Sequence, residues 1–235
     1  VGSMYHKNSY DDIKDKLPPY LRGYFDAAML AQLNIYGDNI IDELLTVDIL
    51  KQLSEFVDFR QDKRAFSDIR LVFESTFLGF KLANIERVKT LNLLAKKNKV
   101  ALYTDEQDAS LINVDFKGTV DYMDDMPKVF NNSSINLNMT IRNIRTGIPL
   151  RVWDILGAGG FLLTNYQIEL TDYFKNEESI VYYEDMYDCC KKAEYYLLHE
   201  DKRRQIAAKG HELVSKKHSY INRVEYILDV IGKMS

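Results

Sequence analysis

Cysteine is nearly absent from this sequence: its 235 residues include only Cys189 and Cys190, which are adjacent. Neighbouring cysteines rarely bridge each other, and no third cysteine is present as a partner, so the sequence excludes a disulfide-stabilised fold. Two thiols on a helix are typical of a reducing compartment, and we expect a cytoplasmic protein.

The sequence also lacks long apolar runs and an excess of basic residues. No stretch approaches the roughly 20 apolar residues of a membrane span, and no secretory signal is recognisable. The net charge of −4 gives no basic field to recruit nucleic acid. Only His211 and His218 among the four histidines approach a helical spacing, so we expect no structural zinc site.

The first part of the chain reads as helical. Between residues 8 and 98, apolar residues recur at steps of three and four, the period of a helix. Pro18-Pro19 suits a helix start, and the pattern predicts helices over about 40–56 and 65–83. Asn84 is then expected to cap a further helix.

From Lys99 onward, short apolar runs alternate with helical segments. The runs predict strands at 100–103, 114–116, 135–138, 161–163 and 180–183. The segments between them predict helices at 126–131, 150–156, 168–174 and 186–198. This alternation predicts an α/β fold, in which a Rossmann-like parallel sheet of about five strands is flanked by helices. After Glu200 the chain reads as helical, with a break near 217–219.

The glycine turn at residues 157–160 raises the question of a ligand site. Asp154 precedes it, and Thr164-Asn165-Tyr166-Gln167 follows the predicted strand behind it. Ligands of open α/β sheets bind beyond the carboxyl ends of the strands, where a helix start offers free N–H groups to a phosphate. Asp154 has the chemistry to hold a ribose diol, and Arg142, Arg145 or Arg151 the charge to neutralise a diphosphate.

A purely structural reading of these glycines stands beside the functional one. Gly157 and Gly159-Gly160 also suit the end of a helix that packs on a strand. Taken alone, the pattern favours this structural reading. It does not match the G-x-G-x-x-G fingerprint of dinucleotide-binding proteins.

Five stretches together resemble the donor-binding half of glycosyltransferases of the spore maturation protein CgeB type, which have the GT-B fold. In chain order they are G-T-V-D-Y at 118–122, S-S-I-N-L-N-M-T at 133–140, R-V-W-D-I-L-G-A-G-G-F-L-L-T-N-Y-Q-I-E-L at 151–170, Y-Y-L-L-H at 195–199 and H-S-Y-I-N-R at 218–223. The resemblance covers roughly residue 84 to the end. It implies a helical region at 5–83 and a nucleotide-sugar-binding domain at 84–235.

The resemblance also implies roles for single residues. Asp154 takes the place of the acid that holds the donor ribose. The loop Thr164, Asn165, Tyr166 and Gln167 faces the diphosphate, and Gly118-Thr119-Val120 lies where backbone groups read the base. The candidate phosphate partners are Arg87, Arg142 and Arg151. The implied substrate is a nucleotide-diphosphate sugar such as a UDP-sugar, with no metal and no other cofactor.

The sequence departs from the family pattern at one position. Many retaining GT-B enzymes have two acids eight residues apart, but Thr146 stands eight residues before Asp154. The catalytic group and the stereochemistry are therefore not assigned.

Tyr122-Met123-Asp124-Asp125 matches a metal-binding tetrapeptide of reverse transcriptases. That motif requires a hairpin and a third distant acid, whereas Met126-Pro127 here favours a helix start capped by Asp124 or Asp125. We therefore reject a polymerase function.

Two functions remain: a glycosyltransferase with an unknown protein or glycan acceptor, or a non-catalytic nucleotide- or partner-binding module that keeps the half-fold and meets a partner through its helical half. Residues 1–4, V-G-S-M, resemble a vector remnant. We accordingly expect a fragment that lacks the acceptor domain and transfers sugar poorly by itself, because orientation accounts for roughly 7–11 kcal/mol of a barrier.

Overall fold

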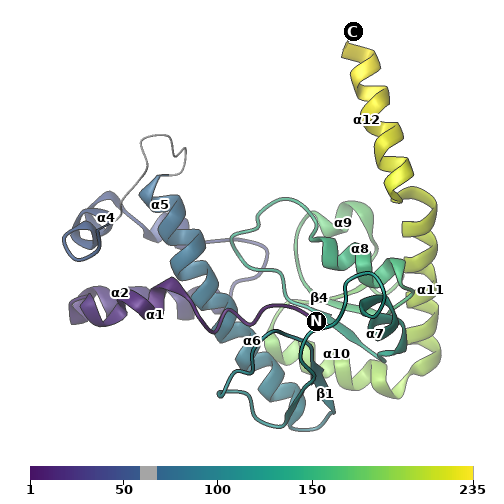
Figure 1. The fold of residues 1–235 in the computed structure, drawn as a ribbon, viewed down its shortest axis with the longest axis horizontal. Helices are drawn as coiled ribbons and strands as arrows, with labels where there is room; N and C mark the ends of the chain where they lie inside the picture. Colours follow the sequence, from purple (N-terminus) through teal and green to yellow (C-terminus); the bar gives the residue numbers. More distant parts are fainter. Residues whose placement is uncertain (59–67, 235) are drawn as a thin grey trace. The chain divides into compact units, whose positions relative to one another are not determined.

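The computed structural model describes residues 1–58 and 68–234, which form two compact units (Figure 1). Unit 1 comprises Val1–Thr119 and Met139–Thr146, and unit 2 comprises Val120–Asn138 and Gly147–Ser235. The chain therefore leaves unit 1, returns to it for the segment Met139–Thr146 and leaves it again. The domain boundary predicted at residue 84 from the family resemblance stays a prediction.

Unit 1 is mainly helical, as predicted for residues 8–98. Its elements are α1 (Ser9–Ile13), the 3₁₀-helix η1 (Lys14–Lys16), α2 (Pro19–Leu33), α3 (Ile41–Leu44), α4 (Val47–Ser54), α5 (Ile69–Val72), the π-helix η2 (Phe73–Gly79), α6 (Phe80–Ala95), β1 (Val100–Leu102) and β2 (Val114–Phe116). The first residues of the helix predicted at 65–83 lie outside the described part of the chain.

The helix predicted over 40–56 is two helices, α3 and α4. Leu45 leaves the helical conformation after α3, and the Thr46 side chain then accepts the N–H of Ile49 to cap α4. A threonine in extended conformation that accepts such a bond is a strong helix start. The periodicity continued across this cap, which is why the sequence suggested one helix.

The prediction that Asn84 caps a helix is wrong, because α6 continues through this residue. The Asn84 amide instead donates to the carbonyl of Met4 at 2.9 Å and to the carboxylate of Asp108 at 3.1 Å. Met4 is 1% exposed, and the N–H of Gly2 donates to the carbonyl of Tyr103. Gly2 and Met4 are thus held in unit 1.

A buried ion pair lies in unit 1. Arg142 donates to the carboxylate of Glu86 at 2.7 Å, and both side chains are at least 96% buried, with 4% and 2% exposed. Tyr36 donates its hydroxyl to the same Glu86 oxygen at 3.0 Å, and the Arg142 guanidinium lies 3.5 Å from the centre of its ring. This cluster holds the segment Met139–Thr146 in unit 1.

Unit 2 alternates helices with strands as predicted. Its elements are α7 (Met126–Asn132), β3 (Asn136–Asn138), α8 (Leu150–Gly157), β4 (Leu162–Asn165), α9 (Leu170–Tyr173), β5 (Val181–Tyr183), α10 (Met186–Leu198), α11 (Glu200–Lys217) and α12 (Tyr220–Met234). The break predicted near 217–219 separates α11 from α12.

In the described part of the chain, the five strands all pair in parallel, which confirms the predicted α/β class. They form two hydrogen-bonded sheets, β1-β2 and β3-β4-β5, and β4 is the central strand of the second sheet. Helix α8 packs against β3 and β4, α10 against β4 and β5, and α11 against α8 (Figure 1). Helices therefore flank the sheet of unit 2, as in a Rossmann-like fold.

Strand β4 is longer than the sequence suggested, because it includes Thr164 and Asn165, which we had assigned to a loop. Both residues are buried, at 0% and 1% exposed. Their polarity is tolerated because the sheet satisfies it: Asn138 donates its side-chain amide to the Thr164 hydroxyl at 2.9 Å.

Helix α7 begins at Met126 with Pro127 in its first turn, as predicted. Asp125 occupies the cap position, but its side chain makes no capping hydrogen bond. Asp121 instead accepts the N–H groups of Met123 and Asp124. The acids of the Tyr122-Met123-Asp124-Asp125 stretch thus lead into a helix and not a hairpin.

Replacing Arg142 by leucine should lower the free energy of unfolding by about 3–5 kcal/mol near neutral pH, because the Glu86 carboxylate loses its counter-charge in the core. Burial already raises the pKa of Glu86 above its usual 4.5. Its protonation therefore favours the folded state, and this contribution is lost as the pH rises above about 4.5. The difference between the variant and the unchanged protein should accordingly shrink toward acid pH.

Urea unfolding at pH 5 and pH 8, followed by circular dichroism, measures this difference. Arg204→Leu is the control, because Arg204 is 77% exposed and its pair with Glu200 should contribute at most about 1 kcal/mol. If Arg142→Leu lowers the free energy of unfolding equally at both pH values, the charge of Glu86 is not the cause of the destabilisation.

Candidate functional site

Asp154 lies on α8, where the hydroxyl of Tyr122 donates to its Oδ1 at 2.9 Å. This hydrogen bond to a carboxylate raises the pKa of the Tyr122 phenol. The other carboxylate oxygen of Asp154 has no donor among the described residues. A half-buried acid thus presents one oxygen that is already held and one that is available.

Arg151 lies one turn before Asp154, on the same side of α8. Its Nη1 is 3.1 Å from the sulfur of Met126, and its guanidinium lies 5.4 Å from the centre of the Phe130 ring. Burial lowers the pKa of Arg151, while the nearby charge of Asp154 opposes this shift. Arg151, Asp154 and Tyr122 therefore form one electrostatic cluster in unit 2.

The carboxyl end of β4 exposes a row of backbone donors. The N–H groups of residues 170–172 bond to the carbonyls of residues 167–169, at 3.1–3.2 Å, and Tyr166 donates to the carbonyl of Tyr183. The N–H groups of Gln167, Ile168 and Glu169, by contrast, have no acceptor in the described part of the chain. Successive free N–H groups make an anion-binding concavity.

The structure changes which N–H groups are available for the phosphate contact that we predicted at the start of the following helix. Helix α9 has four residues, too few to build a large dipole, and its own first N–H groups are already bonded. An anion would therefore be held by the N–H groups of residues 167–169 before the helix. The side-chain oxygen Oε1 of Gln167 is buried and has no hydrogen-bond partner, so a donor on a ligand would satisfy it.

The loop before α8 meets this loop after β4. The N–H of Gly147 donates to the carboxylate of Glu169. The start of α8 and residues 167–169 consequently lie at the same edge of the sheet in unit 2. Thr164 is different, because its buried hydroxyl is engaged by Asn138 and donates to the carbonyl of Asn165.

The remaining candidate residues belong to unit 1, except Val120. Arg87, Arg142, Gly118 and Thr119 belong to unit 1, and Val120 begins unit 2. Arg87 donates to the carbonyls of Ser3 and Met139, and Arg142 is paired with Glu86. Gly118 has a φ of +73°, which favours glycine at this turn. Roles in nucleotide binding stay predictions for these residues.

The glycines after Asp154 have a structural role. Gly157 ends α8, and Gly159 has a φ of +76°. A Cβ on Gly160 would lie 2.7 Å from the carbonyl oxygen of Phe130 and 2.6 Å from the side-chain nitrogen of Asn136. The turn therefore ends the helix and lets the backbone pass close to α7 and β3.

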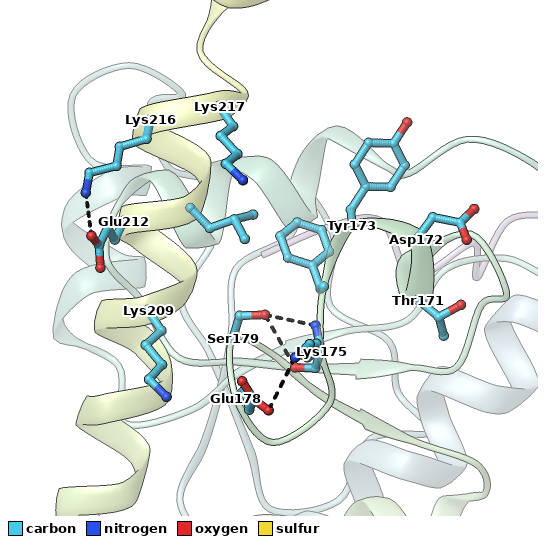
Figure 2. A pocket seen from close by; sticks show the side chains of 12 residues that line it. Thr171, Asp172, Tyr173, Lys175, Glu178, Ser179, Lys209, Glu212, Lys216 and Lys217 are labelled. Carbon is cyan, nitrogen blue, oxygen red and sulfur yellow. Dashed lines mark hydrogen bonds and ion pairs between the residues drawn. The ribbon is translucent and has the colours of Figure 1, made fainter.

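A second feature of unit 2 is a pocket of about 550 Å³ between α9, the loop before β5 and α11 (Figure 2). Lys175, Lys209, Lys216 and Lys217 line it. Lys216 pairs with Glu212, whereas Lys209 and Lys217 have no acidic partner among the described residues. The loop precedes β5 and so lies at the amino end of that strand, opposite to the edge where residues 167–169 follow β4. The pocket contains none of the residues of the predicted donor site.

Two other kinds of site find no counterpart in the described residues. No group of three histidine, cysteine, aspartate or glutamate side chains is arranged to hold a metal ion there. None of the helices in residues 1–58 and 68–234 has the length and apolar character that a membrane crossing requires.

Comparison with protein families gives a match to a family described as glycosyl transferase-like, over residues 84–229. This range covers more than half of the chain and includes the whole of the β3-β4-β5 sheet. The chain belongs to the glycosyl transferase-like family. Neither the search of curated proteins nor the search of solved structures found a match.

In this member of the glycosyl transferase-like family, the structure shows site groups whose roles the sequence analysis had not assigned. Tyr122 appeared in a rejected polymerase motif and in one stretch of the family resemblance, with no role assigned to it, yet it holds Asp154. The sequence suggested free N–H groups at the helix start after β4, but residue identity does not show which residues carry them, because every non-proline residue has an N–H group. Only the G-T-V-D-Y stretch of the family resemblance gave a signal for Tyr122.

Gly160→Ala should lower the free energy of unfolding by about 1–3 kcal/mol, because the added methyl group overlaps the carbonyl of Phe130. Gly157→Ala is the matched control three residues earlier. A Cβ there meets nothing within 4 Å, so alanine should leave stability unchanged or raise it by up to about 1 kcal/mol. Thermal and urea unfolding of both variants measures the difference, and equal stabilities would refute the close packing at Gly160.

Proposed function

We propose that unit 2 binds a nucleoside-diphosphate sugar, such as a UDP-sugar, for transfer to an acceptor. The family match over residues 84–229 supports transfer of a glycosyl group. The finer assignment, to a CgeB-type enzyme of the GT-B fold that needs no metal, is supported by the five sequence stretches described above.

The free N–H groups of Gln167, Ile168 and Glu169 are the observation that carries this proposal. They follow the central strand of a parallel sheet at its carboxyl end, where α/β proteins bind their ligands. Backbone N–H groups are fixed in place by the fold, so binding a diphosphate costs little side-chain entropy. Such donors also stabilise negative charge that develops on a leaving group.

Asp154 and Arg151 supply the complementary side-chain contacts. The available oxygen of Asp154 accepts hydrogen bonds from the ribose hydroxyls, while Tyr122 holds the other oxygen and fixes the carboxylate. Arg151 carries the positive charge of the same cluster and attracts the diphosphate.

In the transfer step, the bond between the anomeric carbon and the diphosphate oxygen breaks. A new bond forms between that carbon and an acceptor oxygen, whose proton leaves to a base. The nucleoside diphosphate departs with the electron pair and an added negative charge. The N–H groups of residues 167–169 are suited to bind that charge more strongly than the uncleaved sugar donor.

Asp154→Ala should weaken the binding of UDP by roughly 10- to 100-fold, because a hydrogen bond to a charged group contributes about 1.5–3 kcal/mol. Isothermal titration calorimetry with UDP measures the affinity. Asp229→Ala is the control, since Asp229 lies exposed on α12 and pairs with Lys233. Equal affinities for UDP in the Asp154 and Asp229 variants would remove Asp154 from the site.

Arg151→Ala should weaken UDP binding more than uridine binding, because its charge acts on the phosphates. Competition titrations with the two ligands give the ratio of affinities. A loss of equal size for both ligands would contradict the charge role, and the absence of UDP binding by the unchanged protein would overturn the proposed donor.

A further inference from the structure

Unit 1 contains a pocket of its own, with a volume of about 570 Å³. This size is in the range of small-molecule sites. Its charged and amide side chains are those of Asp42, Asp68, Arg70, Glu74, Asn143 and Arg145. Glu74 belongs to the π-helix η2, and such helices occur frequently at functional sites.

Among the described residues of the pocket, one pair of opposite charges is at hydrogen-bond distance and the others lie farther apart. Arg145 lies 3.0 Å from Asp42 but 4.0 Å from Glu74, and Arg70 lies 3.9 Å from Asp42. Asp68 is engaged as the cap of α5, where it accepts the N–H of Leu71. The side chain of Glu74 is 7% exposed, and Asn39 donates to one of its oxygens.

Several polar atoms of the lining lack partners. The side-chain oxygen of Asn143 is buried without a hydrogen bond. It packs near Gly79, since a Cβ atom added to that glycine would lie 3.6 Å from it. The second carboxylate oxygen of Glu74 and the Nη2 of Arg70 likewise have no partner among the described residues. Leaving a buried acceptor unpaired costs free energy, so a ligand that donates to Asn143 would be stabilised.

The mixture of acceptors and donors narrows the ligand class. A phosphate or carboxylate would suit Arg70 and Arg145 but would be repelled by Asp42 and Glu74. An ammonium group would suit the acids but leave the guanidinium donors unfilled. Hydroxyl groups donate and accept at once, and several on one ring satisfy both sets without adding charge.

We infer that the pocket of unit 1 binds a neutral, hydroxyl-rich sugar through Asn143, Glu74, Arg70 and Arg145. The identification of this sugar as the acceptor rests on the proposed glycosyl transfer, whereas the binding itself does not. The wall residues 143–146 run directly into Gly147, so the pocket and the loop before α8 are consecutive in the chain.

Saturation-transfer difference NMR on the full 235-residue chain tests this inference. The neutral probes are methyl α-glucoside, methyl β-galactoside, methyl α-mannoside and N-acetylglucosamine. Glucosamine and glucose 6-phosphate are the cationic and anionic comparisons. We expect at least one neutral probe to bind more tightly than both charged ones.

Two variants locate the binding. Asn143→Leu removes the unpaired acceptor, and Arg145→Ala removes a donor that is 51% exposed and so tolerates replacement. Each variant should lower the affinity for the neutral sugar by at least about tenfold. The control Arg204→Ala replaces an exposed arginine in unit 2 and should leave this affinity unchanged. Circular dichroism confirms that the variants are folded.

Binding of no neutral probe, binding of the charged probes alone, or equal affinities in all variants would overturn the inference. Titration with UDP separates this result from the donor site. Loss of sugar binding in the Asn143 and Arg145 variants, with their UDP affinity unchanged, supports the pocket of unit 1 as the sugar site. Binding of the neutral sugar without binding of UDP would contradict the proposed donor but would support the sugar site in unit 1.

Discussion

The buried ion pair between Glu86 and Arg142 is the constraint on which the chain path depends. A pair with both partners in the core is costly to desolvate and very costly to break, because either partner left alone is an uncompensated charge. Here it fixes Met139–Thr146 in unit 1, while β3 before this segment and α8 after it belong to unit 2. The hydroxyl of Tyr36 adds a second donor to Glu86, which offsets part of the desolvation cost.

The elements of the fold follow from the sequence wherever one local pattern dominates. Short apolar runs predicted all five strands, and the alternation with helices predicted their parallel pairing. The predictions fail where a contact with a residue distant in the sequence determines the local structure. Asn84 has the side chain of a cap but lies inside α6, and its amide meets Met4 and Asp108 instead. Thr164 and Asn165 look like loop residues, yet the sheet buries them because Asn138 satisfies the threonine.

The candidate site was predictable only in part, for a similar reason. Asp154 and Arg151 were identified because their types and spacing fit a nucleotide and a family pattern. Arg142 was chosen for the same charge, but burial beside Glu86 cannot be read from its neighbours in the sequence. The role of Tyr122 depends on a hydrogen bond that spans 32 residues, and the free N–H groups after β4 depend on backbone geometry alone.

Most of the candidate arginines have structural partners, which leaves fewer side chains for anion recognition. Arg87 holds two carbonyls, Arg142 holds Glu86, and Arg145 pairs with Asp42. Arg151 remains as the guanidinium of the Asp154 cluster. In a chain of net charge −4, the proposed diphosphate would therefore depend on the backbone donors of residues 167–169 more than on side-chain charge. Because these donors are held by β4 and by the turn of α9, they are in place before a ligand arrives, and their strength should depend little on salt compared with exposed charges.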